Sequence, residues 1–228
     1  MSSIAKVSIQ GNPNVGLYVY ACDDFALVGN AASSEDVKEI QDALKVPVHQ
    51  VNVCGTSLVG IFVVGTKSHV IVPSIIFDDE LAKLQKIAKQ YKREVLVLDT
   101  KFTALGNIMA ISGPLLITNN DVEDSVIKQL KTAGVQNVLR TEIADTDAVG
   151  SALVFSAKGG LVHPDISNKS IEQLEKALGF NLMLGTVNWG SPYVRSGVVC
   201  NSHGFLIGTT SSGPEVRNTD EALGFFQQ

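Results

Sequence analysis

The strongest candidates for catalytic chemistry in this sequence are one thiol and two imidazoles in its last third. Cys200 and His203 stand three residues apart, and His163 is followed at once by Pro164 and Asp165. A thiol nucleophile needs an adjacent base, and carboxylates are the groups that hold a cationic substrate. These residue types raise two possibilities, a cysteine-dependent active site and half of a metal site.

The surrounding sequence favours structural roles for the same residues. Cys200 falls in the alternating apolar run VVCNSHG, which predicts a thiol buried inside a strand, and His203 falls in the turn that follows. His163 ends an apolar run, so we expect its hydrogen bonds to be satisfied locally at the entry to a loop. The chain has three cysteines, with no CxxC pair and no histidine cluster. We therefore expect no catalytic residue, no metal, no cofactor and no disulfide framework.

The elements that position these side chains recur five times along the chain. Each unit begins with a glycine, then has an apolar run, a turn and a second apolar run; the glycines are Gly16, Gly60, Gly106, Gly150 and Gly197, at steps of 44, 46, 44 and 47 residues. An amphipathic segment with apolar residues three and four apart follows each time, and a third apolar run leads to the next glycine. Each unit therefore predicts a strand, a hairpin, a strand, a helix and a strand.

The two ends of the chain complete each other. The last unit lacks its third apolar run, and the N-terminal segment IAKVSIQGNPNVG has the pattern of the missing strand. A closed ring leaves no exposed terminal face, whereas an open array of repeats needs capping units. All-β propellers are disfavoured because every unit contains a helix. We therefore predict an α/β fold, a single five-bladed α-β propeller of residues 1–228 with pseudo-fivefold symmetry and a last blade closed by the N-terminal strand. The expected blades are approximately 16–59, 60–105, 106–149, 150–196, and 197–228 plus 1–15.

Composition and charge narrow the class of partner. The chain has 228 residues, of which 45% are hydrophobic and 18% charged, and its formal net charge is −5. This balance fits a globular protein and does not supply the positive field that drives non-specific binding to nucleic acid. The first ten residues lack the pattern of a signal peptide, and the longest apolar runs are far shorter than a membrane span. We expect a cytoplasmic protein that binds no DNA and no membrane and prefers a basic partner.

Three strings in separate units carry a resemblance to a known family. They are TALGN at 103–107, GGLVHPD at 159–165 and GTVNWGS at 185–191. With these strings and its five units, the whole chain resembles the archaeal and eukaryotic translation initiation factor 6 family, a propeller of the pentein class, and its length is similar to that of the archaeal branch. The resemblance implies a non-enzymatic ribosome anti-association factor. Such a factor binds the intersubunit face of the large ribosomal subunit, prevents joining to the small subunit and takes part in large-subunit maturation.

The resemblance also implies partners and site residues. The expected contacts are chiefly ribosomal proteins near the sarcin-ricin loop, with limited contact to rRNA, and the protein is expected to be a monomer. The family binds through the end of the propeller where each return strand turns through the repeated glycine. Asn107 is the residue that we favour most, because an amide both donates and accepts hydrogen bonds. The ribosome-binding residues that carry over by motif match are Gly106, Asn107, Ile61, Ser151, Ala152 and Tyr193.

Three questions stay open at the level of the sequence. Other pentein proteins modify guanidino groups with a Cys nucleophile, a His and acidic residues, so the alternative function is an enzyme of that class, which would use the thiol and imidazoles described above. A nucleic-acid clamp would need a basic channel, and few basic residues apart from Arg195 lie at the repeated junctions. Trp189, the single tryptophan, is compatible both with burial at a blade edge and with exposure as an interface anchor.

Overall fold

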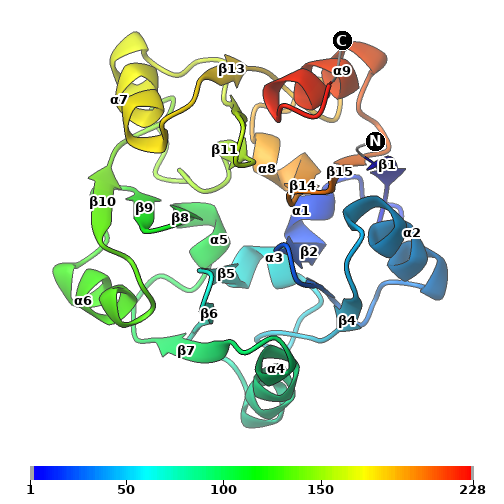
Figure 1. Ribbon diagram of the computed structural model, residues 1–228, viewed down its shortest axis with the longest axis vertical. Helices are drawn as coiled ribbons and strands as arrows, with labels where there is room; N and C mark the ends of the chain where they lie inside the picture. Colours follow the sequence, from blue (N-terminus) through cyan, green and yellow to red (C-terminus); the bar gives the residue numbers. More distant parts are fainter. Residues whose placement is uncertain (1–2, 227–228) are drawn as a thin grey trace.

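The structure is a computed structural model in which residues 3–226 are described. Five sheets of three strands stand around a central axis, and each sheet carries a long helix on its outer side (Figure 1). This arrangement confirms the predicted five-bladed α-β propeller. Met1, Ser2, Gln227 and Gln228, which the expected fifth blade includes, lie outside the described residues.

Each blade has an inner, a middle and an outer strand, counted from the central axis. In the first four blades the long helix joins the middle strand to the outer one, and in the fifth the helix follows the middle strand near the C-terminal end while the N-terminal strand is the outer one. In this order the strands of the five blades are β2 (Val19–Ala21), β3 (Ala26–Val28) and β4 (Val48–Gln50); β5 (Val64–Gly65), β6 (His69–Pro73) and β7 (Glu94–Leu98); β8 (Met109–Ser112), β9 (Leu115–Thr118) and β10 (Asn137–Arg140); β11 (Leu153–Phe155), β12 (Gly160–Val162) and β13 (Leu182–Leu184); and β14 (Val198–Cys200), β15 (Gly204–Gly208) and β1 (Ser3–Val7). The long helices are α2 (Ser34–Leu44), α4 (Asp78–Gln90), α6 (Asp124–Thr132), α7 (Asn168–Leu178) and α9 (Gly213–Ala222).

The N-terminal strand closes the ring as predicted. β1 pairs in parallel with β15, from Ser3 opposite Gly204 to Val7 opposite Gly208. The ammonium group of Lys6 adds a bond to the carbonyl oxygen of Ser211 at 2.6 Å. The fifth blade is therefore built from both ends of the chain. The helix of this blade, α9, begins at Gly213, where Ser212 caps it and Pro214 occupies its first turn.

Strand directions define two faces of the disc. In every blade the inner strand is antiparallel to the middle strand, and the outer strand is parallel to the middle strand. Middle and outer strands therefore end on the side where inner strands begin. We call this side the loop face; it holds the turns at 9–12, 53–56, 143–146 and 187–191. The opposite side, which holds the turns between inner and middle strands at 22–25, 66–68, 113–114, 156–159 and 201–203, is the hairpin face.

The repeats suggested that each repeated glycine begins a strand. In the structure these glycines instead precede the inner strands, in one-turn helices on the loop face. In the fourth blade a turn takes the place of the helix. These helices are α1 (Val15–Tyr18), α3 (Val59–Phe62), α5 (Leu105–Ile108) and α8 (Val194–Gly197). The prediction that Gly197 is the fifth member is wrong, because Arg195 takes the equivalent place. Ser196 N donates to Tyr193 O at 2.9 Å in α8, just as Asn107 N donates to Ala104 O at 2.9 Å in α5.

Close backbone approach explains the four remaining glycines. A β-carbon on Gly60 would lie 2.0 Å from the carbonyl oxygen of Gly16, and one on Gly106 would lie 2.2 Å from that of Gly60. One on Gly150 would lie 2.4 Å from the carbonyl oxygen of Gly106. None of these glycines has a positive φ, so they are required by space and not by backbone conformation. The ring around the axis is thus held by direct contact between successive blades.

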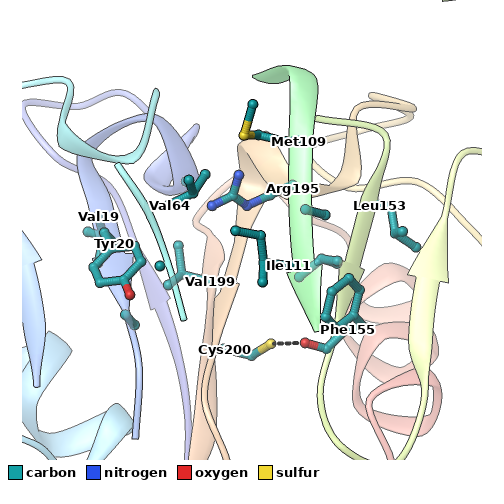
Figure 2. A pocket seen from close by; sticks show the side chains of 15 residues that line it. Val19, Tyr20, Val64, Met109, Ile111, Leu153, Phe155, Arg195, Val199 and Cys200 are labelled. Atoms are coloured by element: carbon teal, nitrogen blue, oxygen red, sulfur yellow. Dashed lines mark hydrogen bonds between the residues drawn. The ribbon is translucent and has the colours of Figure 1, made fainter. Parts of the chain in front are cut away.

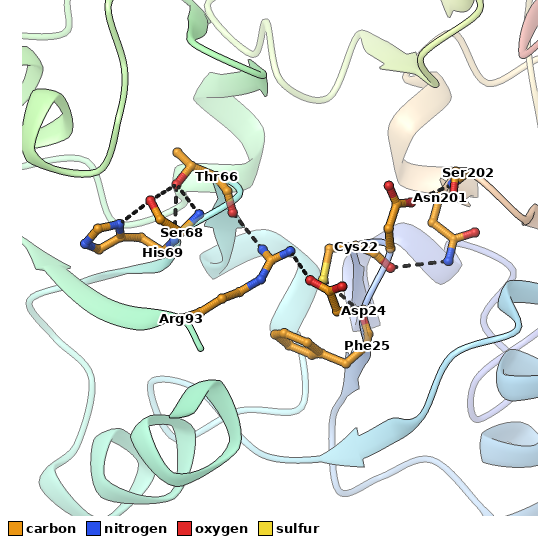
Figure 3. A network of polar contacts seen from close by, with 10 residues as sticks. Cys22, Asp24, Phe25, Thr66, Ser68, His69, Arg93, Asn201 and Ser202 are labelled. Atoms are coloured by element: carbon orange, nitrogen blue, oxygen red, sulfur yellow. Dashed lines mark hydrogen bonds and ion pairs between the residues drawn. The ribbon is translucent and has the colours of Figure 1, made fainter. Parts of the chain in front are cut away.

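Side-chain bonds on the hairpin face add further ties between blades (Figure 3). Arg93 of blade 2 donates to Asp24 Oδ2 of blade 1 at 2.7 Å and to the carbonyl oxygen of Thr66 at 2.7 Å. Asn201 of blade 5 donates to the carbonyl oxygen of Leu44 in blade 1 at 2.8 Å. The hydrophobic core clusters likewise combine residues from neighbouring blades. Among residues 3–226, no helix is long and apolar enough to cross a membrane.

Candidate functional site

In four blades one residue directly follows the repeated glycine, and in the fifth blade the equivalent residue follows Arg195. These five residues lie together at the mouth of the central channel on the loop face. Each is half-buried at an equivalent place in its blade, so the five side chains surround the axis. Two of the predicted contacts, Asn107 and Ser151, line this mouth, and Ile61 occupies the same position on α3. The structure therefore brings together the predicted contacts of blades 2, 3 and 4. The five residues are Leu17, Ile61, Asn107, Ser151 and Ser196.

Asn107 is held by the neighbouring blade through one half of its amide. Ser151 Oγ donates to Asn107 Oδ1 at 3.1 Å, and Ser151 N donates to the carbonyl oxygen of Asn107 at 3.2 Å. Within residues 3–226, Asn107 Nδ2 has no hydrogen-bond acceptor. The amide is thus oriented by its oxygen and keeps a donor available to a partner.

Two of the predicted residues lie below the surface. Gly106 is buried in the glycine ring, and Ala152 is completely buried in a core cluster with Ile143 and Val149. Neither presents a side chain to the solvent. A bulky side chain at Ala152 would overpack this core, so its effect on binding could not be separated from its effect on the fold.

Aromatic side chains extend the loop face outward from the channel mouth. Tyr193 is 41% exposed, and Trp189 is 80% exposed at the tip of the turn between β13 and α8. The structure therefore favours exposure over burial for the tryptophan. The equivalent turns at 9–12, 53–56 and 143–146 have two residues between their bridging partners, and the Trp189 turn has three. That single extra residue is the sequence signal that could have identified the exposed turn.

The Trp189 turn is rigidly held although its tip is exposed. Asn188, Trp189 and Gly190 all have positive φ angles, of 50°, 62° and 93°. The buried carboxylate of Glu215 accepts bonds from Gly190 N at 2.9 Å and Trp189 N at 3.3 Å. It also accepts a hydrogen bond from Thr186 Oγ1 at 3.0 Å, and it forms the capping box of α9 together with Ser212. One carboxylate therefore joins the turn to the last helix.

Replacing Glu215 by glutamine should loosen the turn. Burial by itself raises the pKa of Glu215, but the bonds from Ser212 and Gly190 outweigh it and leave this pKa below its ordinary value. A carboxylate whose pKa is lower in the folded state than in the unfolded state stabilises the fold at pH values above the unfolded-state pKa. This contribution is lost as the pH falls through the folded-state pKa. We expect Glu215→Gln to cost about 2 kcal/mol at pH 7, since bonds to a charged acceptor are lost. Urea unfolding should show this difference shrinking as the pH is lowered toward 3; a constant difference would contradict the assignment.

Carboxylates dominate the rest of the loop face. All five long helices begin on this face, and acidic side chains are favoured at helix N-termini because they complement the helix dipole. The turns that follow the outer strands add more acidic residues. Exposed basic residues in these segments are Lys101 and Lys169. The exposed acidic residues are Glu35, Asp78, Asp79, Asp99, Asp121, Asp124, Glu142, Asp145, Asp147 and Asp165.

The thiol and imidazoles considered for catalysis are placed in structural roles. Cys200 Sγ donates to the carbonyl oxygen of Phe155 at 3.2 Å, and burial raises the pKa of this thiol to about 12. His163 is buried, accepts a bond from Asp165 N at 3.1 Å through Nδ1, and contacts the Tyr193 ring by its edge. His203 is exposed in a hairpin turn. Over residues 3–226, no cluster of three or more His, Cys, Asp and Glu side chains could hold a metal ion.

All three thiols should react slowly. Burial raises the pKa of all three thiols, to about 11 for Cys54 and to about 12 for Cys200. The thiolate is the reactive form of a cysteine. We expect alkylation by iodoacetamide at pH 7.5 to be slower for each thiol than for free cysteine, by at least about tenfold for Cys54 and Cys200, and to become fast in urea. Mass spectrometry of timed samples measures this. One cysteine that labels faster than free cysteine would instead indicate an activated nucleophile.

Comparison with known proteins gives two kinds of match. The sequence profile of the eIF-6 family matches residues 4–222. A protein named translation initiation factor 6 in Saccharolobus islandicus is 35% identical over 97% of this chain and 99% of the relative. A protein of the same name in Staphylothermus marinus is 34% identical over 93% of this chain and 94% of the relative. The relative in Pyrococcus abyssi is 30% identical over 97% and 98%.

Solved structures match the fold alone. A dimethylarginine dimethylaminohydrolase adduct with S-methyl-L-thiocitrulline has a TM-score of 0.53 at 12% identity, over 90% of this chain and 71% of its own. An adduct of the same kind of enzyme with 4-chloro-2-hydroxymethylpyridine has a TM-score of 0.55 at 13% identity, over 80% and 73%. The blades are thus arranged as in these hydrolases. At this level of identity the match carries no activity over to this chain.

Proposed function

Because the chain belongs to the eIF-6 family, we propose that it is a ribosome anti-association factor that binds the large ribosomal subunit on its intersubunit face. Bound there, it prevents joining to the small subunit, and it takes part in maturation of the large subunit. It acts in the cytoplasm as a monomer and without catalysis. Its contacts are chiefly with ribosomal proteins near the sarcin-ricin loop, with limited contact to rRNA.

The composition of the loop face is the observation that supports this proposal. Exposed carboxylates surround the channel mouth, while Trp189 and Tyr193 supply large apolar contacts beside it. Such a surface suits a basic ribosomal protein and repels naked RNA. Since the ring of blades and the Glu215 bonds hold these side chains in place, little conformational entropy is lost on docking. The bulk of the disc then blocks subunit joining.

Sedimentation through sucrose tests the proposal. The protein is mixed with purified large subunits, alone or with small subunits, at several salt concentrations. We expect it to sediment with free large subunits and to reduce the amount of joined ribosomes. Recovery only at the top of the gradient under all conditions, or joining that is unaffected by excess protein, would overturn the proposal.

Asn107→Asp gives a local test of the docking face. The aspartate keeps the oxygen that accepts from Ser151 Oγ and loses the Nδ2 donor that faces the partner. We expect binding to the large subunit to weaken by about tenfold, which corresponds to one hydrogen bond of roughly 1.4 kcal/mol, with no change in melting temperature. Fluorescence titration of labelled protein with large subunits measures the affinity. If this variant binds as tightly as the parent, Asn107 is not part of the contact.

A further inference from the structure

A channel runs along the axis of the propeller. Its cavity of about 130 Å³ lies between the inner strands of all five blades (Figure 2). The glycine ring narrows it at the loop face. Residues at the hairpin end of the inner strands, including Ala21, Ile111 and Phe155, are partly exposed, whereas those at the other end are buried. The wider opening of the channel is therefore on the hairpin face.

One cationic side chain projects into this apolar channel. Arg195 stands where the other four blades have glycine, and its guanidinium reaches into the cavity beside Val64 and Ile111 (Figure 2). Nη1 donates to the carbonyl oxygen of Gly106 at 2.5 Å. Among residues 3–226, Nε and Nη2 have no acceptor, and no carboxylate pairs with this guanidinium. Burial lowers the pKa of Arg195, yet an arginine keeps its charge at any pH at which proteins fold.

A second donor lines the same cavity from another blade. Tyr20 is only 6% exposed, and its side chain lines the wall formed by β2 (Figure 2). Its hydroxyl group has no hydrogen-bond partner in the described part of the chain. A β-carbon on Gly65 would lie 2.1 Å from this oxygen, so the neighbouring blade leaves room for it. The free donors of Arg195 and Tyr20 are open to the space of the cavity, where water or a ligand can bond to them.

We propose that the channel binds a small oxyanion, such as inorganic phosphate, between Arg195 and Tyr20. A planar guanidinium with two free donors and a phenol hydroxyl are the groups that recognise such an anion. The cavity is large enough, since one water needs only about 10–15 Å³ of this space.

Calorimetric titration with inorganic phosphate in a chloride buffer of constant ionic strength tests the site. We expect saturable binding with one phosphate per chain in the parent protein. Arg195→Gly restores the residue found at this place in the other blades, so it should fold, and its affinity should fall at least tenfold. Tyr20→Phe removes only the hydroxyl group and should weaken binding several-fold. Lys169→Met, which removes a positive charge on the loop face, should bind phosphate as the parent does.

Three results would overturn the proposal. The first is the absence of saturable binding by the parent at millimolar phosphate, which would mean that water alone hydrates Arg195. The second is equal affinity in the parent and Arg195→Gly, which would place the anion elsewhere. The third is unchanged affinity in Tyr20→Phe, which would contradict the assigned pair of donors. Melting curves of each variant without phosphate establish that the comparison is made between folded proteins.

Discussion

Replacing Gly60 by alanine is expected to destabilise the propeller by about 3 kcal/mol, the upper range for overpacking a dense core. The new β-carbon would lie 2.0 Å from the carbonyl oxygen of Gly16 and 2.7 Å from that of Val19. Both are backbone atoms of the preceding blade, so neither can move without separating the blades. For a chain of this size the change corresponds to a fall in melting temperature of roughly 10 °C.

Gly213→Ala is the matched control for this experiment. Gly213 lies in the first turn of α9, is exposed and has no atom within 4 Å of a β-carbon placed on it. The same chemical change there should cost much less stability than at Gly60, because the β-carbon is opposed only by the ring of the adjacent Pro214 and alanine restricts the unfolded chain. Calorimetric melting of the two variants and the parent measures the difference. Equal melting temperatures for Gly60→Ala and the parent would contradict the glycine ring as the contact that holds the blades together.

Trp189→Ala is expected to weaken binding to the large ribosomal subunit by about 30-fold. A large aromatic side chain at the centre of an interface contributes 2 kcal/mol or more when it is removed, and 1.4 kcal/mol is a tenfold change. The indole is 80% exposed, and the bonds that hold its turn come from backbone amides, which the substitution keeps. Stability should therefore be unchanged while affinity falls.

Ile4→Ala provides the control for an exposed apolar side chain elsewhere. Ile4 is 40% exposed on β1, at the outer edge of the fifth blade. Titration of fluorescently labelled variants with large subunits should give the parent affinity for Ile4→Ala and a much weaker one for Trp189→Ala. Should the two variants bind alike, the Trp189 turn lies outside the contact.

The architecture could be predicted from the sequence because its determinants are local and repeated. The alternation of the apolar runs and the spacing of Leu81, Leu84 and Ile87 indicate strands and a helix without any knowledge of the partner blade. Closure of the ring followed from a missing strand at one end and a surplus strand at the other. The pairing of Lys6 with Ile207 confirms it.

Contacts between blades could not be predicted in the same way. Gly197 carries the spacing of the repeat, yet Arg195 occupies the ring position, because which residue faces the next blade depends on backbone geometry in three dimensions. Burial of Ala152 has the same cause. Exposure of Trp189 depends on one extra residue in its turn and on the distant carboxylate of Glu215, neither of which a local pattern describes.

Hydrogen–deuterium exchange of the protein, free and bound to large ribosomal subunits, tests most directly whether the loop face is the docking surface. The account predicts slower exchange on binding at 105–108 and 187–193, and unchanged exchange in the hairpin turns at 22–25, 66–68 and 156–159. Protection confined to these hairpin turns, with free exchange at the loop face, would contradict it.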